Sequence, residues 1–317
     1  FEPPIVASTC LQINNWLFSY RDSFDYCIID EASQIMMPIC LGPLRLCEKF
    51  ILVGDHFQLP PLVISPNAKG LSESLFKILS EKYPEGLSEL TYQYRMCKEV
   101  MLLSNTLVYN GKLKAGNETV SSRFLPIDNP HLIDGYKTKF LDGQKDWVRV
   151  ILREDSKVLF LNNDKVPALE TAFNDQVTNS VESELVKIIV ESLLACGVDE
   201  SSIGVMSLYR GQLRLLNRLL YRRKKIEILT ADQFQGRDKD CIIISLVRSN
   251  PEHNVGALLN EWRRINVAMT RSRSKLIVIG SRLTLESSKT IRDFILLAES
   301  NGWSYNLPEN AEKMYKF

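Results

Sequence analysis

Short apolar runs alternate with amphipathic segments along most of this chain, a pattern typical of βαβ units and a mostly parallel sheet. Runs rich in Ile, Val and Leu predict strands at residues 27–29, 50–53, 158–160, 204–208, 226–229, 241–244 and 275–279. Apolar positions at helical spacing predict helices at residues 180–196, 211–223, 260–270 and 290–300. The pattern therefore predicts an α/β fold.

The pattern changes at two places. A turn signal at residues 83–86, Tyr-Pro-Glu-Gly, separates one helical pattern from the next, so we expect two domains over residues 1–86 and 87–317. The length of 317 residues is enough for two buried cores. Residues 110–155 carry scattered Gly, Pro, Asn and Asp without a clean period, and we expect a long irregular excursion there.

Composition excludes several classes of protein. No apolar run approaches the roughly twenty residues of a membrane-spanning helix, and the first residues lack the pattern of a secretory signal, so we expect no membrane partner. The seven cysteines form no Cys-x-x-Cys pair, and we interpret them as reduced core residues of an intracellular protein rather than as metal ligands. The net charge is only +1, and the basic clusters at 222–225 and 263–275 are each more typical of a solvated helix face than of a nucleic-acid site.

The first candidate site follows the predicted strand at residues 27–29. Asp30 and Glu31 come directly after this apolar run, at what we expect to be the carboxyl end of a buried strand. Ligands of open α/β sheets bind at that end. In a nucleoside triphosphatase the first carboxylate would hold magnesium and the second would polarise the attacking water. The pair alone is equally compatible with a solvated strand end.

Three further side chains suit phosphoryl transfer. Gln58 lies in a polar loop after the strand at 50–53 and could sense the γ-phosphate, although Asp and Gln closing a tight turn would give the same pattern. Arg95 and Arg271 are candidate arginine fingers, which stabilise the negative charge that phosphoryl transfer spreads over the γ-oxygens. Most single arginines instead pair with surface carboxylates or extend into solvent.

Loops after the later strands offer contacts for phosphates. Residues 230–238 include Gln235, Gly236 and Asp238, where the glycine permits close backbone approach and the side chains can bond phosphate or ribose, with a simple glycine turn as the alternative. Residues 209–212, Tyr-Arg-Gly-Gln, begin a predicted helix whose positive end favours a phosphate. Arg248 and Asn250 follow the strand at 241–244.

In order along the chain, these loops resemble the motif set of superfamily 1 helicases of the nonsense-mediated-decay helicase type, over essentially the whole chain. Six motifs occur in the right order. Within that group, residues 38–44, 160–167, 247–250 and 262–264 most resemble the eukaryotic replication helicase/nucleases, which trim Okazaki-fragment flaps and resect broken DNA ends. The resemblance implies RecA-like parallel sheets of the P-loop NTPase kind, with one partial domain (1–86) and one near-complete domain (87–317).

The resemblance also implies a role for each candidate residue. Asp30 would hold the magnesium of ATP, Glu31 would activate water and Gln58 would couple the two, with Arg95 and Arg271 as fingers. The nucleotide would be bordered by Gly54, Asp55, Gln235, Gly236 and Asp238. Single-stranded DNA would contact Ser8, Thr9, Tyr209, Arg210, Gln212, Thr230, Arg248 and Asn250, in a salt-sensitive way that does not read sequence. The implied activity is ATP-driven translocation in the 5′-to-3′ sense.

One motif of the family is missing. No Gly-x-x-x-x-Gly-Lys in the chain is followed by Ser or Thr, so the phosphate-binding loop is absent. We therefore expect a fragment that is inactive alone, with the P-loop, a small barrel and a nuclease domain carrying a 4Fe-4S cluster upstream of it. The resemblance further implies 5′ flaps, resected ends and a single-strand-binding protein as partners, in the nucleus and also in the mitochondrion.

Two other functions stay open at this point. Motor motifs contact the nucleic-acid backbone, so they do not separate a DNA helicase from an RNA-directed relative. A remnant motor that serves as a non-catalytic single-strand clamp would also carry these loops. Competition between matched DNA and RNA strands distinguishes the first alternative, and substitution of the catalytic candidates distinguishes the second.

Overall fold

The computed structural model describes residues 3–20, 22–174 and 176–317. The chain divides into two compact units, Phe1–Glu89 (unit 1) and Leu90–Phe317 (unit 2). The division falls a few residues after the turn at 83–86 on which the expected boundary was based.

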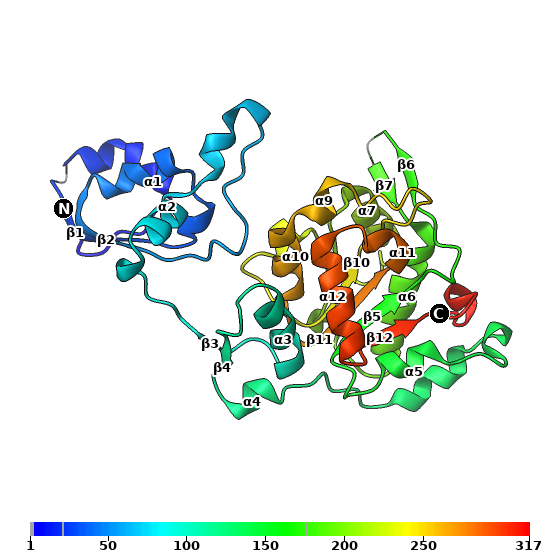
Figure 1. Ribbon diagram of the computed structural model, residues 1–317. Helices are drawn as coiled ribbons and strands as arrows, with labels where there is room; N and C mark the ends of the chain where they lie inside the picture. Colours follow the sequence, from blue (N-terminus) through cyan, green and yellow to red (C-terminus); the bar gives the residue numbers. More distant parts are fainter. Residues whose placement is uncertain (1–2, 21, 175) are drawn as a thin grey trace. The chain divides into compact units, whose positions relative to one another are not determined.

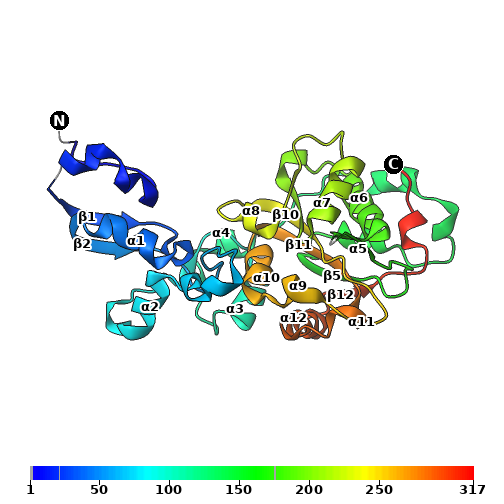
Figure 2. The ribbon, with the colours of Figure 1, turned by 90° about the horizontal axis from the view of Figure 1, so that it is seen from above.

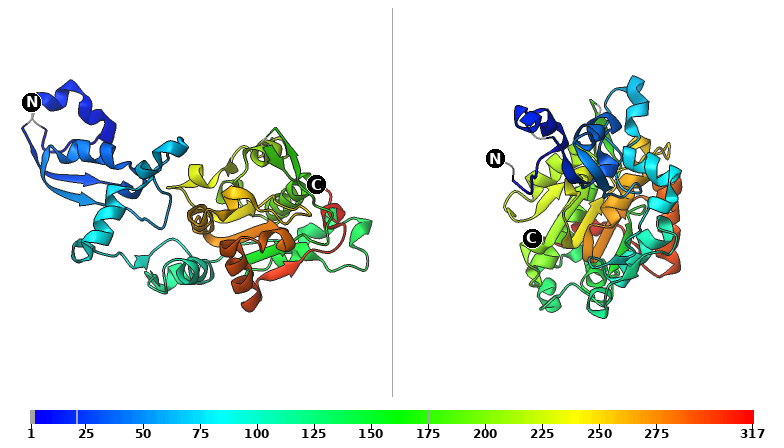
Figure 3. Two further views of the ribbon diagram at one scale, coloured as in Figure 1. Left: turned by 45° about the horizontal axis from the view of Figure 1, so that its top comes forward. Right: turned by 90° about the vertical axis from the view of Figure 1, so that its left-hand side faces the viewer.

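Unit 1 is built on a two-stranded parallel sheet, whose strands lie side by side in Figure 3. Its strands and α-helices are β1 (Phe24–Ile29), α1 (Met37–Leu44), β2 (Cys47–Leu52) and α2 (Leu75–Lys82). Ile29, Ala32 and Cys40 form a small buried core, against which side chains of α1 and α2 pack. Both predicted strands are therefore present, and they end at the same edge.

The expectation of a buried strand before Asp30 is wrong for most of β1. Only Ile29 is buried, whereas Tyr26 and Ile28 are 58% and 66% exposed. Phe50 and Ile51 of β2 are exposed as well. The physical reason is that, among the described residues, no third strand extends this sheet, so its strands lack the neighbours that bury a central strand.

Unit 2 contains a six-stranded sheet in the order β12-β5-β11-β10-β8-β9, and every neighbouring pair is parallel. Its strands are β5 (Val158–Asn162), β8 (Ile203–Ser207), β9 (Glu227–Leu229), β10 (Lys239–Ser245), β11 (Ser272–Gly280) and β12 (Ser304–Asn306). Successive side chains of a strand point to opposite faces, so Cys241 and Ile243 enter one core while Ile242 and Ile244 enter the other. The α/β prediction is confirmed.

Helices cover both faces of this sheet, as Figures 1 and 2 show. Side chains of α6 (Ser180–Ala195) and α7 (Arg210–Leu219) pack on one face. Side chains of α3 (Lys98–Leu107), α10 (Trp262–Met269) and α12 (Lys289–Ser300) pack on the other. The shorter elements are β3 (Tyr92–Gln93), β4 (Lys114–Ala115), α4 (Glu118–Ser121), α5 (Trp147–Ile151), β6 (Thr171–Phe173), β7 (Gln176–Thr178), α8 (Ala231–Phe234), α9 (Gly256–Asn260) and α11 (Arg282–Leu285).

Two predicted helices have different bounds in the structure. The pattern at 211–223 continues past the end of α7, which stops at Leu219. The helix expected at 260–270 is divided between α9 and α10, because Glu261 caps α10 by accepting a hydrogen bond from the Arg263 N–H. No helix in the described part of the chain has the length and apolar content that crossing a membrane requires.

The excursion at residues 110–155 is less irregular than its sequence indicates. It contains β4, α4 and α5, and its side chains Ile133, Trp147, Val148 and Ile151 are fully buried in the core that α6 shares. Buried Lys275 of β11 donates hydrogen bonds to the carbonyls of Ile151, Arg153 and Ser156. The excursion is therefore part of the cover of unit 2.

Candidate functional site

Two loops of unit 1 meet at the carboxyl ends of β1 and β2. The Ala32 N–H donates to the Val53 carbonyl over 2.8 Å, and the Asp55 N–H donates to the Ser33 hydroxyl over 3.3 Å. A Cβ at Gly54 would lie only 2.9 Å from the Ser33 nitrogen, so the loops approach this closely because residue 54 is glycine. The predicted acidic and glutamine loops are therefore neighbours.

The carboxylates of these loops are held by short-range hydrogen bonds. Asp30 Oδ1 accepts from the Glu31 N–H over 2.9 Å, and Glu31 Oε2 accepts from the Gln34 side-chain amide over 2.6 Å. Both carboxylates are exposed. In the second loop, Asp55 Oδ2 accepts from the Gln58 side-chain amide over 2.9 Å. In this structure Gln58 therefore contacts Asp55, not the acidic pair that it was expected to couple.

The acidic loop fits a magnesium ion that is bound together with phosphates. Mg²⁺ is usually held by one or two carboxylates, several waters and substrate phosphates, not by a full set of protein ligands. No group of three or more His, Cys, Asp or Glu in the described residues could hold a metal ion. Asp30 and Glu31 supply two exposed carboxylates at a strand end, which is enough for the open kind of site.

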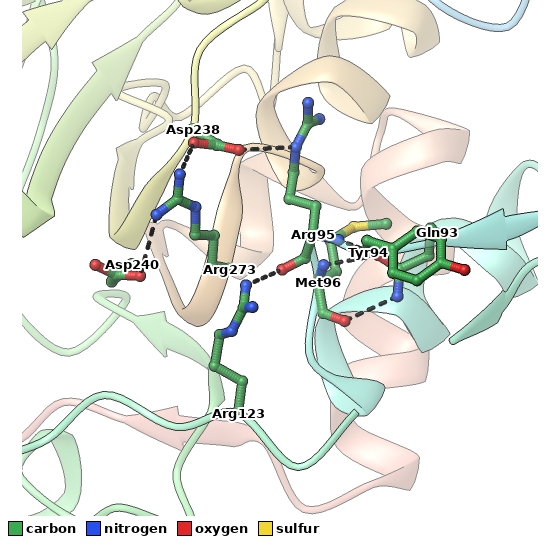
Figure 4. A pocket seen from close by; sticks show the side chains of 8 residues that line it. All are labelled: Gln93, Tyr94, Arg95, Met96, Arg123, Asp238, Asp240 and Arg273. Carbon is green, nitrogen blue, oxygen red and sulfur yellow. Dashed lines mark hydrogen bonds and ion pairs between the residues drawn. The ribbon is translucent and has the colours of Figure 1, made fainter. Parts of the chain in front are cut away.

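In unit 2, Arg95 lies in a cleft of about 760 Å³, shown in Figure 4. Its Nε contacts Asp238 Oδ2 over 3.1 Å, and Arg273 contacts the other oxygen of the same carboxylate over 2.6 Å. Arg123 donates to the Arg95 carbonyl over 2.8 Å. The wall is completed by Gln93, Tyr94, Met96 and Asp240. Asp238 directly precedes β10 and Arg273 is the second residue of β11, so the cleft lies at the amino ends of the strands.

Arg271 lies behind this cleft. Its side chain is 2% exposed, donates to the Val267 carbonyl over 2.9 Å, and also contacts the Thr270 hydroxyl. Arg95 donates to the carbonyl of the same Thr270 over 3.4 Å. The structure therefore brings the two predicted fingers together around one residue, with Arg95 on the cleft side.

In the predicted loop at 230–238, Thr230 caps the helix that follows it, whereas Asp238 pairs with an arginine far away in the sequence. Thr230 and Gln233 form a reciprocal capping box at the start of α8, so the Thr230 hydroxyl is used within its own helix. Gly236 has a φ of 76° and is exposed, and Asp238 belongs to the cleft. The side-chain amide nitrogen of Gln235 is buried and has no partner within the described residues. Asp238, directly before β10, lies at the amino edge of the sheet together with Arg95, whereas Thr230 directly follows β9 and lies at the carboxyl edge.

A buried polar network lies at the opposite, carboxyl edge of the sheet. Gln212 is fully buried, with its oxygen accepting from the Asn179 N–H over 2.8 Å and its nitrogen donating to the Ser245 hydroxyl over 3.0 Å. Asn179 donates to the carbonyls of Ala168 and Val247. Gln212 was expected to touch nucleic acid, but in this structure it holds the protein loops instead.

Glu182 is the fully buried carboxyl of this network. Its Oε1 accepts from the Ser245 hydroxyl over 2.8 Å and from the Val247 N–H over 3.0 Å. Burial raises the pKa of Glu182 to about 7, against the opposing effect of these hydrogen bonds. Val247 has a φ of 71°, a strained value for a β-branched residue. Glu182 and Asn179 therefore fix both sides of the strained residue before Arg248.

The remaining nucleic-acid candidates of unit 2 surround this network. Glu170 Oε2 accepts from Arg248 Nε over 2.8 Å, from the Ser249 N–H over 2.8 Å and from the Asn250 amide over 3.1 Å. Tyr209 is buried and donates to the Val255 carbonyl, and burial raises the pKa of its hydroxyl. Arg210 is exposed. One edge of unit 2 therefore carries four of the nucleic-acid candidates, Tyr209, Arg210, Arg248 and Asn250. Two further candidates, Ser8 and Thr9, are exposed residues of unit 1.

Several residues of these sites were not predicted. Tyr94, Arg123 and Arg273 line the cleft, and Asn179, Glu182 and Glu170 hold the opposite edge. The burial of Glu182 could have been predicted from the sequence. It lies three residues before Leu185 and seven before Ile189, so helical spacing places it on the apolar face of the helix. No comparable signal marks Glu170 or Arg123, since their partners are distant in sequence.

Comparison with protein families gives two matches that together include most of the chain. Residues 2–66 match one family and residues 71–283 match a second, and both families are described as AAA domain. Among curated proteins, the chain is 50% identical over 319 residues to the DNA replication ATP-dependent helicase/nuclease DNA2 of Saccharomyces cerevisiae, covering 99% of this chain and 21% of that protein. It is 45% identical over 282 residues to DNA2 of Homo sapiens, covering 87% and 26%. The chain therefore spans about a fifth to a quarter of the length of these relatives.

Among solved structures, the helicase nonstructural protein 10 of an arterivirus is similar at 12% identity, with a TM-score of 0.36 over 82% of this chain and 40% of that one. Its complex with DNA gives a TM-score of 0.37 at 14% identity. Similarity at this level does not establish a shared arrangement of the chain.

Proposed function

This chain belongs to the AAA domain family, and from that premise we propose that it is the motor part of an ATP-dependent, 5′-to-3′ single-stranded DNA translocase of the replication helicase/nuclease type. The observation that carries the proposal is that the similarity to replication helicase/nucleases runs through nearly the whole chain. The candidate residues on separate edges of unit 2 support it, because a motor must couple a nucleotide site to a nucleic-acid site.

In this proposal, unit 1 is the C-terminal part of a first RecA-like domain and unit 2 is the second RecA-like domain. Unit 1 supplies the acidic loop, with Asp30 as the ligand of the magnesium of ATP and Glu31 as the base that orients the attacking water. Gly54 and Asp55, with Gln58, border the same loop. Bound magnesium would neutralise charge on the phosphates.

Unit 2 supplies the positive charge for hydrolysis. Arg95 is the residue best placed to reach a γ-phosphate, because it is partly exposed in an open cleft while Arg271 is buried behind it. A phosphate that approaches Arg95 would compete with Asp238 for the guanidinium. Tyr94, which is 63% exposed at the cleft, presents an aromatic ring on which a base can stack.

The carboxyl edge of unit 2 would bind the strand through Arg210, Arg248 and Asn250, with Tyr209 and Thr230 beside them. Gln212 acts in this proposal by holding the loop through Ser245, because its side chain is buried. Ser8 and Thr9 would add contacts from unit 1. Such contacts address the backbone, so binding is expected to be salt-dependent and largely independent of sequence.

The cellular setting is proposed from the same relatives. The substrates would be 5′ flaps and resected DNA ends, with a single-strand-binding protein as partner. The site of action would be the nucleus and also the mitochondrion. A 4Fe-4S cluster would belong to a nuclease domain outside these 317 residues.

The first test is ATP turnover with single-stranded DNA, measured for this chain and for a longer form of the protein that includes a Gly-x-x-x-x-Gly-Lys-Ser/Thr loop. We expect turnover only in the longer form, reduced about 100- to 10,000-fold by Glu31→Gln. Glu48→Gln is the matched control, because Glu48 is an exposed carboxylate of β2 in the same unit. Turnover that survives Glu31→Gln, or its absence from the longer form, would contradict the proposal.

A further inference from the structure

An exposed arginine face runs along α7, starting from Arg210. Arg210, Arg214 and Arg218 follow one another at intervals of four residues and are all exposed. At about 100° per residue they lie within an arc of roughly 80°, and at about 1.5 Å per residue they span roughly 12 Å. The opposite side of the helix carries Leu213 and Leu216, which are buried.

Among the described residues, no ion pair compensates the charges on this face. Helix α7 contains no Asp or Glu, and none of the three arginines has an ion pair among the residues that the structure describes. The neighbouring Arg223, by contrast, pairs with Glu191. Arg210 also occupies the positive end of the helix dipole, where a cation is unfavourable. An anionic ligand would relieve both the repulsion between the arginines and the unfavourable position of Arg210.

The hairpin next to the first turn of α7 carries an exposed aromatic side chain. The hairpin of β6 and β7 packs on the first turn of α7, where a Cβ at Gly211 would lie 2.9 Å from the Thr178 methyl group. Phe173 and Gln176 are cross-strand partners in the hairpin, and the side chains of such partners point to the same face. Gln176 and Thr178 also point to that face, because they are two residues apart in one strand, so Phe173 is on the same face as Thr178. Phe173 is 74% exposed. The hairpin therefore presents a solvent-facing ring on the side that is turned toward α7.

We propose that Phe173, Arg214 and Arg218 form an additional binding surface for the sugar-phosphate backbone and one base of a single nucleic-acid strand, continuing from Arg210. An exposed ring beside a row of cations is the combination by which proteins bind single strands without reading sequence. The inference rests on the proposed function, because it extends the strand contacts of the carboxyl edge.

Two observations favour a nucleic-acid strand over an acidic peptide. The surface is continuous with the candidate strand contacts, since Glu170, directly before the hairpin, holds Arg248 and Asn250. The arginine face of α7 also lacks apolar anchors: its exposed residues are Arg210, Arg214, Asn217 and Arg218. Protein partners usually bury a cluster of apolar or aromatic side chains at the centre of an interface.

The test measures binding of an oligothymidine strand to the full-length protein over a series of salt concentrations. For Arg214→Ala with Arg218→Ala, we expect weaker binding and a slope of log K against log salt that is smaller by about 1.4, because each lost phosphate contact removes about 0.7. Arg214→Lys with Arg218→Lys should restore the slope. The matched control is Arg292→Ala, at an exposed arginine of α12 on the opposite face of the sheet.

The ring is tested separately. Phe173→Ala should weaken binding about fivefold and leave the salt slope unchanged, because one stacked base is lost without a charge. Phe173→Trp should retain binding and show fluorescence quenching when the strand is added. All these positions are exposed, so thermal unfolding should match that of the unsubstituted protein.

The outcomes separate this inference from the proposed function. If single-stranded DNA stimulates ATP turnover of the unsubstituted protein but the Arg214, Arg218 and Phe173 variants bind like Arg292→Ala, only this surface is excluded. If polyglutamate displaces the strand and no quenching occurs in Phe173→Trp, the surface serves an acidic protein partner and the inference is wrong. If the unsubstituted protein has no DNA-stimulated turnover, the proposed function itself fails.

Discussion

The two edges of the sheet in unit 2 hold their polar residues in different ways. At the amino edge, charged side chains meet in an open cleft, where Asp238 is shared by Arg95 and Arg273 and its side chain is 25% exposed. At the carboxyl edge, mostly neutral groups are buried, and Gln212, Asn179 and Glu182 are fully enclosed. The amino edge is accessible and ionic, whereas the carboxyl edge is mostly enclosed and is held by hydrogen bonds and by the largely buried Arg248–Glu170 ion pair.

This difference separates groups that can exchange partners from groups that cannot. An exposed ion pair contributes little to stability, so Arg95 can leave Asp238 for a phosphate at small cost. A buried hydrogen-bonded group is costly to leave without a partner, so the network around Glu182 maintains one loop conformation. The amino edge therefore suits a ligand that comes and goes, and the carboxyl edge suits a rigid support for surface contacts.

The largest expected effect concerns the amino edge. Arg95→Ala should reduce ATP turnover of the longer form by about three to five powers of ten while changing the free energy of unfolding by less than about 1 kcal/mol. Arg273→Ala is the matched variant, since it removes the other arginine on Asp238. Equal losses of turnover in both variants would indicate that Arg95 acts only by holding the cleft together.

The carboxyl edge should show a pH dependence of stability. The pKa of Glu182 rises from 4.5 to about 7 on folding, so the unfolded chain releases this proton first and stability falls as pH rises between these values. The Glu182→Gln side chain is neutral at every pH. Relative to this variant, the free energy of unfolding of the unsubstituted protein should fall by about 3 kcal/mol as the pH rises from 4.5 to about 7. Urea unfolding at several pH values measures the difference.

Glu182→Ala provides the control for that experiment. It leaves the Ser245 hydroxyl and the Val247 N–H without their acceptor, so it should destabilise at every pH and weaken binding of single-stranded DNA through the loop of Arg248. Glu182→Gln retains an acceptor and should bind DNA almost normally. A constant difference between the protein and Glu182→Gln across the pH range would contradict the raised pKa.

The smallest expected effect compares one chemical change at both edges. Glu170 and Asp238 each hold an arginine, but the Glu170 side chain is 10% exposed and that of Asp238 is 25% exposed. Glu170→Gln should lower the free energy of unfolding by about 1–3 kcal/mol, because Arg248, whose side chain is 12% exposed, loses its charged partner. Asp238→Asn should change it by less than about 1 kcal/mol. If urea unfolding shows a larger loss of stability in Asp238→Asn than in Glu170→Gln, burial does not decide how strongly these two ion pairs stabilise the protein.

Prediction from sequence succeeded where a short segment carries its own signal. The apolar runs at 158–160, 241–244 and 275–279 became central strands, because a strand buried on both faces needs apolar residues throughout. Prediction failed for β1, whose apolar sequence is similar but whose sheet has two strands in the part of the chain that the structure describes. It also missed the packing of residues 110–155, since Ile133 and Trp147 find their partners in α6 and have no periodic pattern of their own.

The sequence by itself determined the α/β class and the acidic loop after β1, because strand patterning and the bonds of Asp30 and Glu31 extend over at most a few residues. Only the tertiary structure decided that Gln212 is buried, that Arg95 shares Asp238 with Arg273, and that Glu182 supports the loop of Arg248. The bonds that make these arrangements join residues 33 to 143 positions apart. Such partners are set by how the strands are ordered and how helices pack on the sheet, which no local pattern specifies.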